Sequence, residues 1–139
     1  LDPSGAFAHD MYAMSLNYAG RSEEAIPIYQ KAIRLNPLGS TILYVAFGNT
    51  LWRAERFEEA VSAYKTGLQR APDNIYSHIG LAGTYSMMGR EKEARAEAEE
   101  ALRLNSKFSL EFYKERAFMY KDQAQVDRFI AALRKAGVK

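Results

Sequence analysis

The sequence contains no cysteine and only two histidines, His9 and His78, among its 139 residues. Without cysteine, the chain cannot form a disulfide framework, a thiolate nucleophile or a cysteine zinc site. Neither histidine has a carboxylate or the other histidine at the spacing that places two ligands on one helix face. We therefore expect no metal site, no cofactor and no catalytic residue, and the composition favours binding over chemistry.

The sequence also lacks a charge excess and long apolar runs. Its 19 Lys and Arg residues stand against 17 Asp and Glu residues, for a net charge of +2. Strong electrostatic capture of nucleic acid or anionic lipid normally needs a larger or better segregated excess. No run of about 18 apolar residues and no signal peptide is present. We therefore expect no nucleic acid or membrane as a partner, and a cytoplasmic location.

What the chain does contain is an internal repeat with a period of 34 or 35 residues. Three segments share one spacing of small, aromatic and turn residues: Ala25-x3-Tyr29-x2-Ala32-x4-Pro37, Ala60-x3-Tyr64-x2-Gly67-x4-Pro72 and Ala94-x3-Ala98-x2-Ala101-x4-Ser106. Each follows an upstream half with a matching spacing of its own: Tyr12-Ala13-x2-Leu16, Phe47-Gly48-x2-Leu51 and Leu81-Ala82-x2-Tyr85. Agreement at so many positions in three copies indicates a repeat architecture.

These residues resemble the tetratricopeptide repeat (TPR), whose pattern of W-x2-L-G-x2-Y, A-x3-F and P has a period of 34 residues. The resemblance covers nearly the whole chain, with three strong copies and a weaker fourth from about Ser109. It implies an all-α fold, an α-α superhelix (a TPR solenoid) of about eight antiparallel helices. The sequence departs from the pattern at the family's Trp position, which holds His9, Tyr44 and His78.

The apolar residues alone also predict helices. They recur at three- and four-residue spacing in eight segments, residues 6–19, 22–35, 40–54, 57–71, 75–88, 91–104, 109–120 and 124–136. Small residues such as Gly48 and Ala60 let two antiparallel helices approach closely, while Tyr29 and Tyr64 fill the space beside them. No segment alternates apolar and polar residues for long enough to predict a strand.

We interpret residues 1–139 as a single TPR array. Residues 1–5 are the end of a truncated upstream repeat, 6–39 are repeat 1, 40–74 repeat 2, 75–108 repeat 3, and 109–139 a degenerate repeat 4 with a C-terminal cap. The helix at 124–136 is amphipathic, and a terminal repeat needs such a polar outer face. The first helix would lack a stacking neighbour, so we expect weak homo-oligomers through an N-terminal face that carries Phe7, Met11, Tyr12 and Met14.

The resemblance also implies a binding groove, because the first helix of each repeat lines the inner surface in this family. The groove-facing positions are Phe7, Asp10, Met14 and Asn17, then Ile42, Val45, Asn49 and Trp52, then Tyr76, Ile79, Gly83 and Ser86, with Tyr18, Arg53 and Met87 at the edge. Such a groove, with Trp52 as an aromatic anchor and Asn49 and Arg53 as polar anchors, would bind a peptide or helix. Alternatively, half of these residues pack between neighbouring helices.

Chaperone-binding members of the family hold a C-terminal carboxylate with Lys, Asn and Arg side chains. The matching positions here are Asp10, Met14, Ala46, Tyr76 and Gly80, none of them basic, so the sequence disfavours this mode.

Three functions remain open. The leading hypothesis is a non-enzymatic protein–protein interaction scaffold that binds a protein or peptide partner. The alternative is the C-terminal regulatory segment of a bacterial adenylate or guanylate cyclase or a similar signalling enzyme. The stretches Tyr120-Lys121-Asp122 and Val126-Asp127-Arg128-Phe129 are similar to tails of repeat arrays behind class III nucleotide cyclase domains. A third possibility is an assembly factor that scaffolds homo-oligomers.

Overall fold

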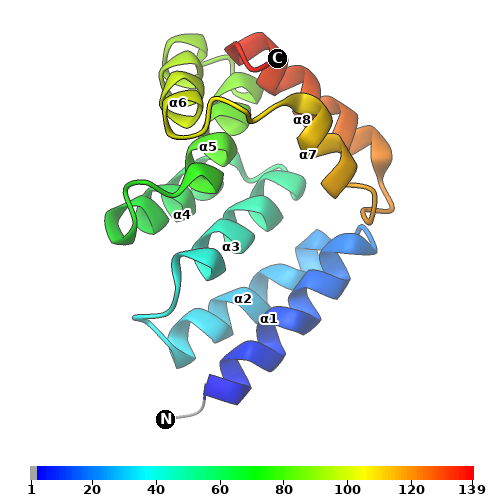
Figure 1. The fold of residues 1–139 in the computed structure, drawn as a ribbon. Helices are drawn as coiled ribbons and strands as arrows, with labels where there is room; N and C mark the ends of the chain where they lie inside the picture. The colour runs from blue at the N-terminus through cyan, green and yellow to red at the C-terminus, as the bar shows by residue number, and fades with distance from the viewer. Residues whose placement is uncertain (1–2) are drawn as a thin grey trace.

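The structure, a computed structural model, describes residues 3–139, apart from the side chains of residues 3, 4, 6 and 7. Within that range it consists of α-helices and turns, without a strand. The helices in Figure 1 are α1 (Pro3–Tyr18), α2 (Ser22–Leu35), α3 (Thr41–Arg53), α4 (Phe57–Arg70), α5 (Ile75–Met87), α6 (Glu91–Leu104), α7 (Leu110–Arg116) and α8 (Gln123–Ala136). The prediction of an all-α superhelix of eight helices is confirmed.

Two helices differ clearly from their predicted ranges. Helix α1 begins at Pro3 rather than at residue 6, since proline fits the first turn of a helix, where its missing N–H has no partner to lose. Helix α7 ends at Arg116 rather than at residue 120, and residues 117–122 form a turn. Residues 1 and 2, which we assigned to an upstream repeat, lie outside the described part of the chain.

The first six helices form three antiparallel pairs, α1 with α2, α3 with α4 and α5 with α6. Consecutive pairs stack, because α2 packs on α3 and α4 packs on α5 (Figure 1).

Tyr64 on α4 shows why the stack is tight. A Cβ atom on Gly48 would lie 2.7 Å from the Tyr64 ring, and a Cβ atom on Gly80 would lie 2.3 Å from it. The two glycines therefore provide the space that the buried ring fills, as the sequence predicts.

The turn within each pair needs a residue with a left-handed backbone. Gly20 and Gly89 occupy that position in the first and third pairs, both with φ of 78°. In the second pair the position holds Glu55, with φ of 62°. A side chain there carries strain that glycine avoids. The carboxylate of Glu55 forms an ion pair with Arg128 of α8, at 2.8 Å, which links this turn to the C-terminal helix.

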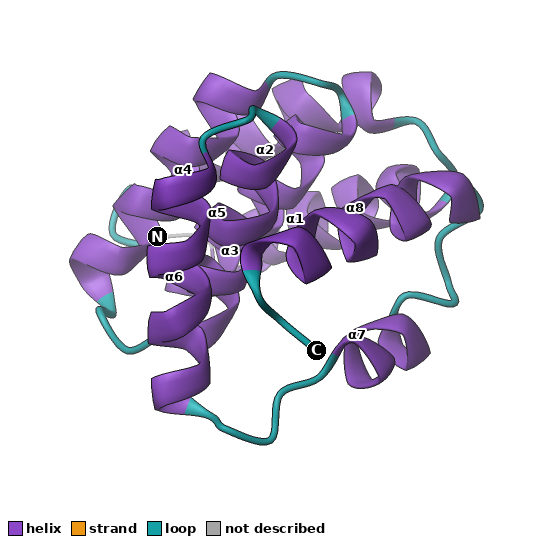
Figure 2. Ribbon diagram, turned by 90° about the horizontal axis from the view of Figure 1, so that it is seen from above, coloured by secondary structure: helices purple, strands orange, loops and turns teal. Residues whose placement is uncertain are grey.

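Helices α7 and α8 depart from the regular stack. We expected the helix at 109–120 to begin a fourth repeat, but it is α8 that packs on α5 and, less extensively, on α6, while α7 packs on α8. Both helices lie on the same side of the stacked pairs in Figures 1 and 2. Helix α8 buries Val126, Phe129, Ile130 and Leu133 and exposes its charged side chains, as its amphipathic sequence predicts.

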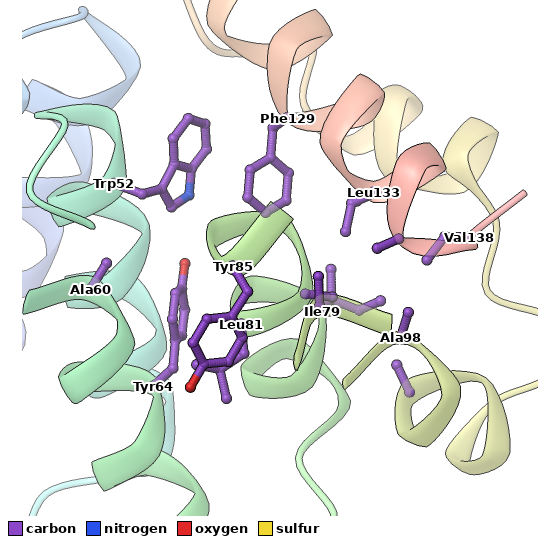
Figure 3. Close-up of a cluster of buried hydrophobic side chains, with 14 of the residues drawn as sticks. Trp52, Ala60, Tyr64, Ile79, Leu81, Tyr85, Ala98, Phe129, Leu133 and Val138 are labelled. Atoms are coloured by element: carbon purple, nitrogen blue, oxygen red, sulfur yellow. The ribbon is translucent and has the colours of Figure 1, made fainter. Parts of the chain in front are cut away.

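The Phe129 ring fixes the position of α8. A Cβ atom on Gly83 of α5 would lie 2.3 Å from this ring, so only glycine lets the two helices approach this closely. The ring also stacks on Trp52 of α3, with centroids 4.6 Å apart, and Figure 3 shows the two side chains next to each other. Phe129 thereby joins α8 to two of the three helix pairs.

We expect Gly83→Ala to destabilise the fold by about 1–3 kcal/mol, because the added methyl group collides with a ring that is itself confined. The gain in helix propensity, about 1 kcal/mol, offsets only part of this cost. Denaturant unfolding followed by circular dichroism measures the change. The exposed α4 substitution Ser62→Ala is the control and should change stability by less than about 0.5 kcal/mol. An unchanged stability in Gly83→Ala would contradict the close contact between the Phe129 ring of α8 and Gly83 of α5.

Candidate binding groove

Two adjoining cavities lie on the face that α1, α3 and α5 share. The inner cavity, of about 160 Å³, lies between α3, α5 and the C-terminal segment, and the outer cavity, of about 340 Å³, lies between α1, α3 and α5. Both are lined by Val45, Asn49, Tyr76 and Tyr120, so they form one continuous depression. The stacking of the three pairs places the first helix of each pair on this face.

Most of the residues that the sequence assigns to a groove line these cavities. Val45, Asn49, Arg53, Tyr76 and Ile79 line the inner cavity, and Asp10, Met14, Asn17 and Tyr18 line the outer cavity together with three of the first group. Trp52 and Met87 line neither cavity. The side chain of Phe7 lies outside the described part of the structure.

Trp52 lies in the core rather than on an open groove. Its side chain is 2% exposed and is covered by Phe129 of α8. Met87 is partly buried against the same core cluster. The alignment of repeats places Trp52 on the inner face of the superhelix and Met87 at its edge, but it does not reveal that Phe129 of the C-terminal helix covers Trp52.

The C-terminal segment also supplies residues that the sequence analysis did not assign to the groove. Phe108, Phe112, Tyr113, Arg116, Ala117, Tyr120 and Phe129 all line the inner cavity. Tyr120 reaches α1, where its ring lies 4.9 Å from that of Tyr18, and the backbone N–H of Lys121 donates to the Tyr18 carbonyl at 2.8 Å. The aromatic spacing of this segment indicates a packed helix, but nothing in it predicts a return to the first helix.

Arg53 is a buried charged residue that lines the inner cavity. Its side chain is 5% exposed, and its guanidinium carbon lies 4.4 Å from the centre of the Trp52 ring and 3.6 Å from that of Tyr120. The two rings hold the guanidinium by cation–π interaction. Its Nε and Nη1 atoms are shielded from solvent, and the Tyr113 hydroxyl lies within hydrogen-bonding reach of the guanidinium. The backbone carbonyl of Arg53 accepts from Gln125 of α8, at 2.8 Å.

Two predicted groove asparagines make hydrogen bonds within the fold. Buried Asn17 donates to the hydroxyl of Thr50 and accepts from the hydroxyl of Ser22, at 2.9 Å, so it joins α1 to α2 and α3. Asn49 accepts from the hydroxyl of Tyr64 at 2.5 Å. Asn17 is therefore a structural contact, whereas Asn49 is half-buried and lines both cavities.

Burial shifts the titration of the polar groups near the groove. Partial burial raises the pKa of the Asp10 carboxyl above its ordinary value of 3.8, although the nearby Tyr29 hydroxyl acts in the opposite direction. Burial also raises the pKa of Tyr113 to about 12 despite the nearby positive charge of Arg53. The tyrosine hydroxyl that faces Arg53 thus stays neutral near neutral pH.

Neither histidine lines these cavities. His78 bonds through Nδ1 to Glu97 at 2.6 Å and through Nε2 to the Pro72 carbonyl at 2.9 Å. His9 bonds to the carbonyl of Gly5 within α1. In the described range, no three His, Asp or Glu side chains gather as a metal site would require. The helices described here are also too short or too polar for any of them to cross a membrane.

Comparisons with known proteins agree on one family. Two family models described as Tetratricopeptide repeat match residues 51–110 and residues 8–37. The TPR repeat-containing protein YpiA of Bacillus subtilis (strain 168) is 28% identical over 116 residues, which are 84% of this chain and 26% of YpiA. The chain thus spans about a quarter of that relative's length.

Solved TPR structures share the fold. The first TPR of Spaghetti (RPAP3), bound to the HSP90 peptide SRMEEVD, superposes with a TM-score of 0.73 at 16% identity, over 96% of this chain and 97% of its own. MamA gives 0.72 at 18% identity, over 97% and 78% of the two chains. A thermophilic TPR protein in Thermus thermophilus gives 0.69 at 18% identity, over 94% and 72%. At these identities the likeness concerns the fold alone.

We expect Asp10→Asn to stabilise the fold near pH 7 by less than about 1 kcal/mol, since solvent screens a half-buried group. The raised pKa means that the folded chain holds the Asp10 proton more tightly than the unfolded chain does. The wild-type carboxyl therefore costs stability once the pH rises through the raised pKa, and costs none below the ordinary value of 3.8.

Thermal unfolding of both chains at about pH 7 and about pH 3 tests this expectation, because the advantage of the variant should disappear at the lower pH. Asp73→Asn is the matched control, because it makes the same exchange of carboxylate for amide at an exposed position. A variant that is less stable than the wild type at neutral pH would mean that the interaction of the carboxylate with Tyr29 outweighs the cost of burial.

Proposed function

This chain belongs to the tetratricopeptide-repeat family, and from that premise we propose that it is a non-enzymatic scaffold that binds a peptide or helix of a partner protein in the groove between α1, α3 and α5. TPR domains typically mediate protein–protein interaction and are typically not enzymes. The observation that carries the proposal is the outer cavity. It is the wider of the two cavities on this face, and its wall exposes the apolar side chains of Ile42 and Tyr76.

The outer cavity has the composition of a peptide-binding surface. Ile42 on α3 is 69% exposed, and Tyr76 on α5 is more than half exposed. Both line this cavity together with Met14 of α1, while Asn49, Asn74 and Asp10 supply polar groups. Apolar and aromatic anchors among a few polar groups are typical of surfaces that bind an extended segment or an amphipathic helix.

The peptide-bound neighbour supports the class of partner but not its sequence. The TPR of Spaghetti (RPAP3) is bound to an HSP90 peptide that carries acidic residues. In this chain the positions that we matched to the family's carboxylate-holding residues are Asp10, Met14, Ala46, Tyr76 and Gly80, without a basic side chain. We therefore propose a partner segment with apolar side chains for the outer cavity.

The activity of the whole protein is a separate proposal, because the curated relative is about four times as long as its matched part. The comparisons reported above name no nucleotide cyclase, so nothing in them supports the alternative of a cyclase regulatory segment. That alternative stays a prediction from the sequence of the tail.

We expect Ile42→Ser to weaken the binding of selected peptides about five- to thirtyfold, since it removes an apolar contact worth about 1–2 kcal/mol from the outer cavity. Peptides are selected from a phage-displayed library on the wild-type chain, and their affinities are compared by fluorescence anisotropy. Leu38→Ser is the matched control, because Leu38 is 87% exposed in the loop before α3 and lines neither cavity. If no peptide is selected, or if both variants bind equally well, the groove is not the binding surface.

We also propose that the chain self-associates weakly through the exposed face of α1, where Met11 and Tyr12 are about half exposed. Sedimentation velocity over a concentration series should show a rising average mass for the wild type and a constant mass for a Met11→Ser, Tyr12→Ser double variant. A wild-type chain that remains monomeric at the highest concentration would refute this proposal.

A further inference from the structure

The inner cavity is close in size to one aromatic ring. Its volume is about 160 Å³, and an apolar protein cavity of about 150 Å³ is large enough to hold a benzene molecule. Its apolar walls come from α3, α5 and the C-terminal segment, through Val45, Ile79, Phe108, Phe112 and Phe129. Aromatic walls favour a further ring, which can stack on them or meet them edge to face. A Phe side chain therefore fits this cavity in both size and chemistry.

The charged groups at the inner cavity disfavour a charged occupant. Among the described residues, two cations line it, Arg53 and Arg116, and no Asp or Glu does. A Lys or Arg side chain would be repelled there, because no carboxylate offsets its charge. An acidic side chain would lose its water among apolar walls, while the Nε and Nη1 atoms of Arg53 are already shielded. The face of an uncharged ring, in contrast, is attracted to a guanidinium.

The inner cavity is accessible from the outer one. Two of its lining residues, Tyr76 and Arg116, are exposed, so the cavity opens to solvent at their side. The buried side chains of Ile79 and Phe129 close it on the side of the core. Tyr120 lines both cavities and is only partly buried. A segment that lies in the outer cavity can therefore extend one side chain past Tyr120 into the inner cavity.

We propose that the inner cavity is an anchor pocket for one uncharged aromatic side chain, such as Phe, of the partner segment bound in the outer cavity. This proposal rests on the proposed function, which supplies that segment. The selectivity of the groove then depends on the C-terminal segment, because Phe108, Phe112 and Phe129 line the pocket and lie outside the three regular helix pairs.

Toluene, which is the side chain of Phe without its backbone, tests the pocket alone. We expect it to bind the wild-type chain with a dissociation constant of about 1 mM, as its size allows. In methyl NMR spectra, the ring should shift the signals of Ile79 and Val45, which line the inner cavity. The signals of Leu38, which is 87% exposed and lines neither cavity, should stay unchanged. If the Ile79 and Val45 signals also stay unchanged, the proposal is overturned.

Ala117 offers a way to block the pocket, because it lines the inner cavity and not the outer one. Ala117→Phe adds a ring of the chain's own at the pocket and should abolish the toluene-induced shifts. Ala96→Phe, the same exchange at an exposed position of α6 that lines neither cavity, is the matched control. The toluene titration of the wild-type chain needs no variant, so it decides whether the pocket accepts a ring even if Ala117→Phe fails to fold.

The peptides selected on the wild-type chain test the occupant. We expect them to share one aromatic residue, whose replacement by Ala weakens binding at least about tenfold, the value of burying such a side chain. Its replacement by Leu should weaken binding about two- to tenfold, the value of contacts between rings beyond the apolar area. On Ala117→Phe, the peptide and its Ala variant should bind equally weakly, because the pocket is already filled.

The two proposals fail separately. Selected peptides that depend on Ile42 but contain no aromatic residue, or tolerate its replacement by Ala, overturn the anchor pocket and leave the proposed function standing. If no peptide is selected, the proposed function fails. Toluene binding would then show a pocket that accepts a ring, but the partner segment would be overturned as its occupant.

Discussion

The position of the Phe129 ring is the constraint on which the C-terminal third of the structure depends. The ring lies over the bare backbone of Gly83, stacks on Trp52 at 4.6 Å and on Tyr113 at 5.4 Å, and is almost fully buried. An aromatic ring that contacts three elements in this way gains dispersion and apolar burial from each of them. Helix α8 consequently lies along α5, and the turn that precedes it carries Tyr120 across to Arg53.

This arrangement divides the inner face of the superhelix into two parts. Under α7 and α8, the chain covers its own face, so Trp52, Arg53 and Ile79 are buried. Beyond Tyr120, the face is open, and apolar side chains such as Ile42 meet solvent. The covered part is small, aromatic and positively charged, whereas the open part is wider and contains the partly buried Asp10. The inner face of this chain thus contains two regions of different chemistry.

The regular part of the fold could be predicted from sequence, because its information is local or periodic. The spacing of Ala25 and Tyr29, repeated at Ala60 and Tyr64, gives the helix pairs, and the small residues opposite each tyrosine give their contacts. The course of the tail could not be predicted in this way. It depends on the fit of Phe129 to Gly83, two residues 46 positions apart in the sequence, and a single occurrence leaves no periodic signal.

The candidate site could likewise be predicted where it is built from repeated positions, but not where the C-terminal segment contributes to it. The alignment of repeats identified the residues on α1, α3 and α5, since the first helices of the pairs are equivalent. It could not separate Trp52, which Phe129 covers, from Val45, which lines both cavities. The role of Asn17 was equally hidden, because its side chain accepts from the Ser22 hydroxyl and donates to Thr50 in a buried network whose members come from three helices.

The contact between Tyr120 and Tyr18 has a consequence for how the chain unfolds. In an open solenoid each repeat touches only its neighbours, so the ends can fray one unit at a time. Here the turn between α7 and α8 bonds to the end of the first helix, through the Lys121 N–H and the Tyr18 carbonyl at 2.8 Å, and the Tyr120 and Tyr18 rings meet edge to face. Melting of the first pair therefore also exposes the tail, and loss of the tail removes a support of the first pair. We therefore expect the repeats to unfold together rather than one after another from the ends, because this contact couples the first helix pair to the C-terminal segment.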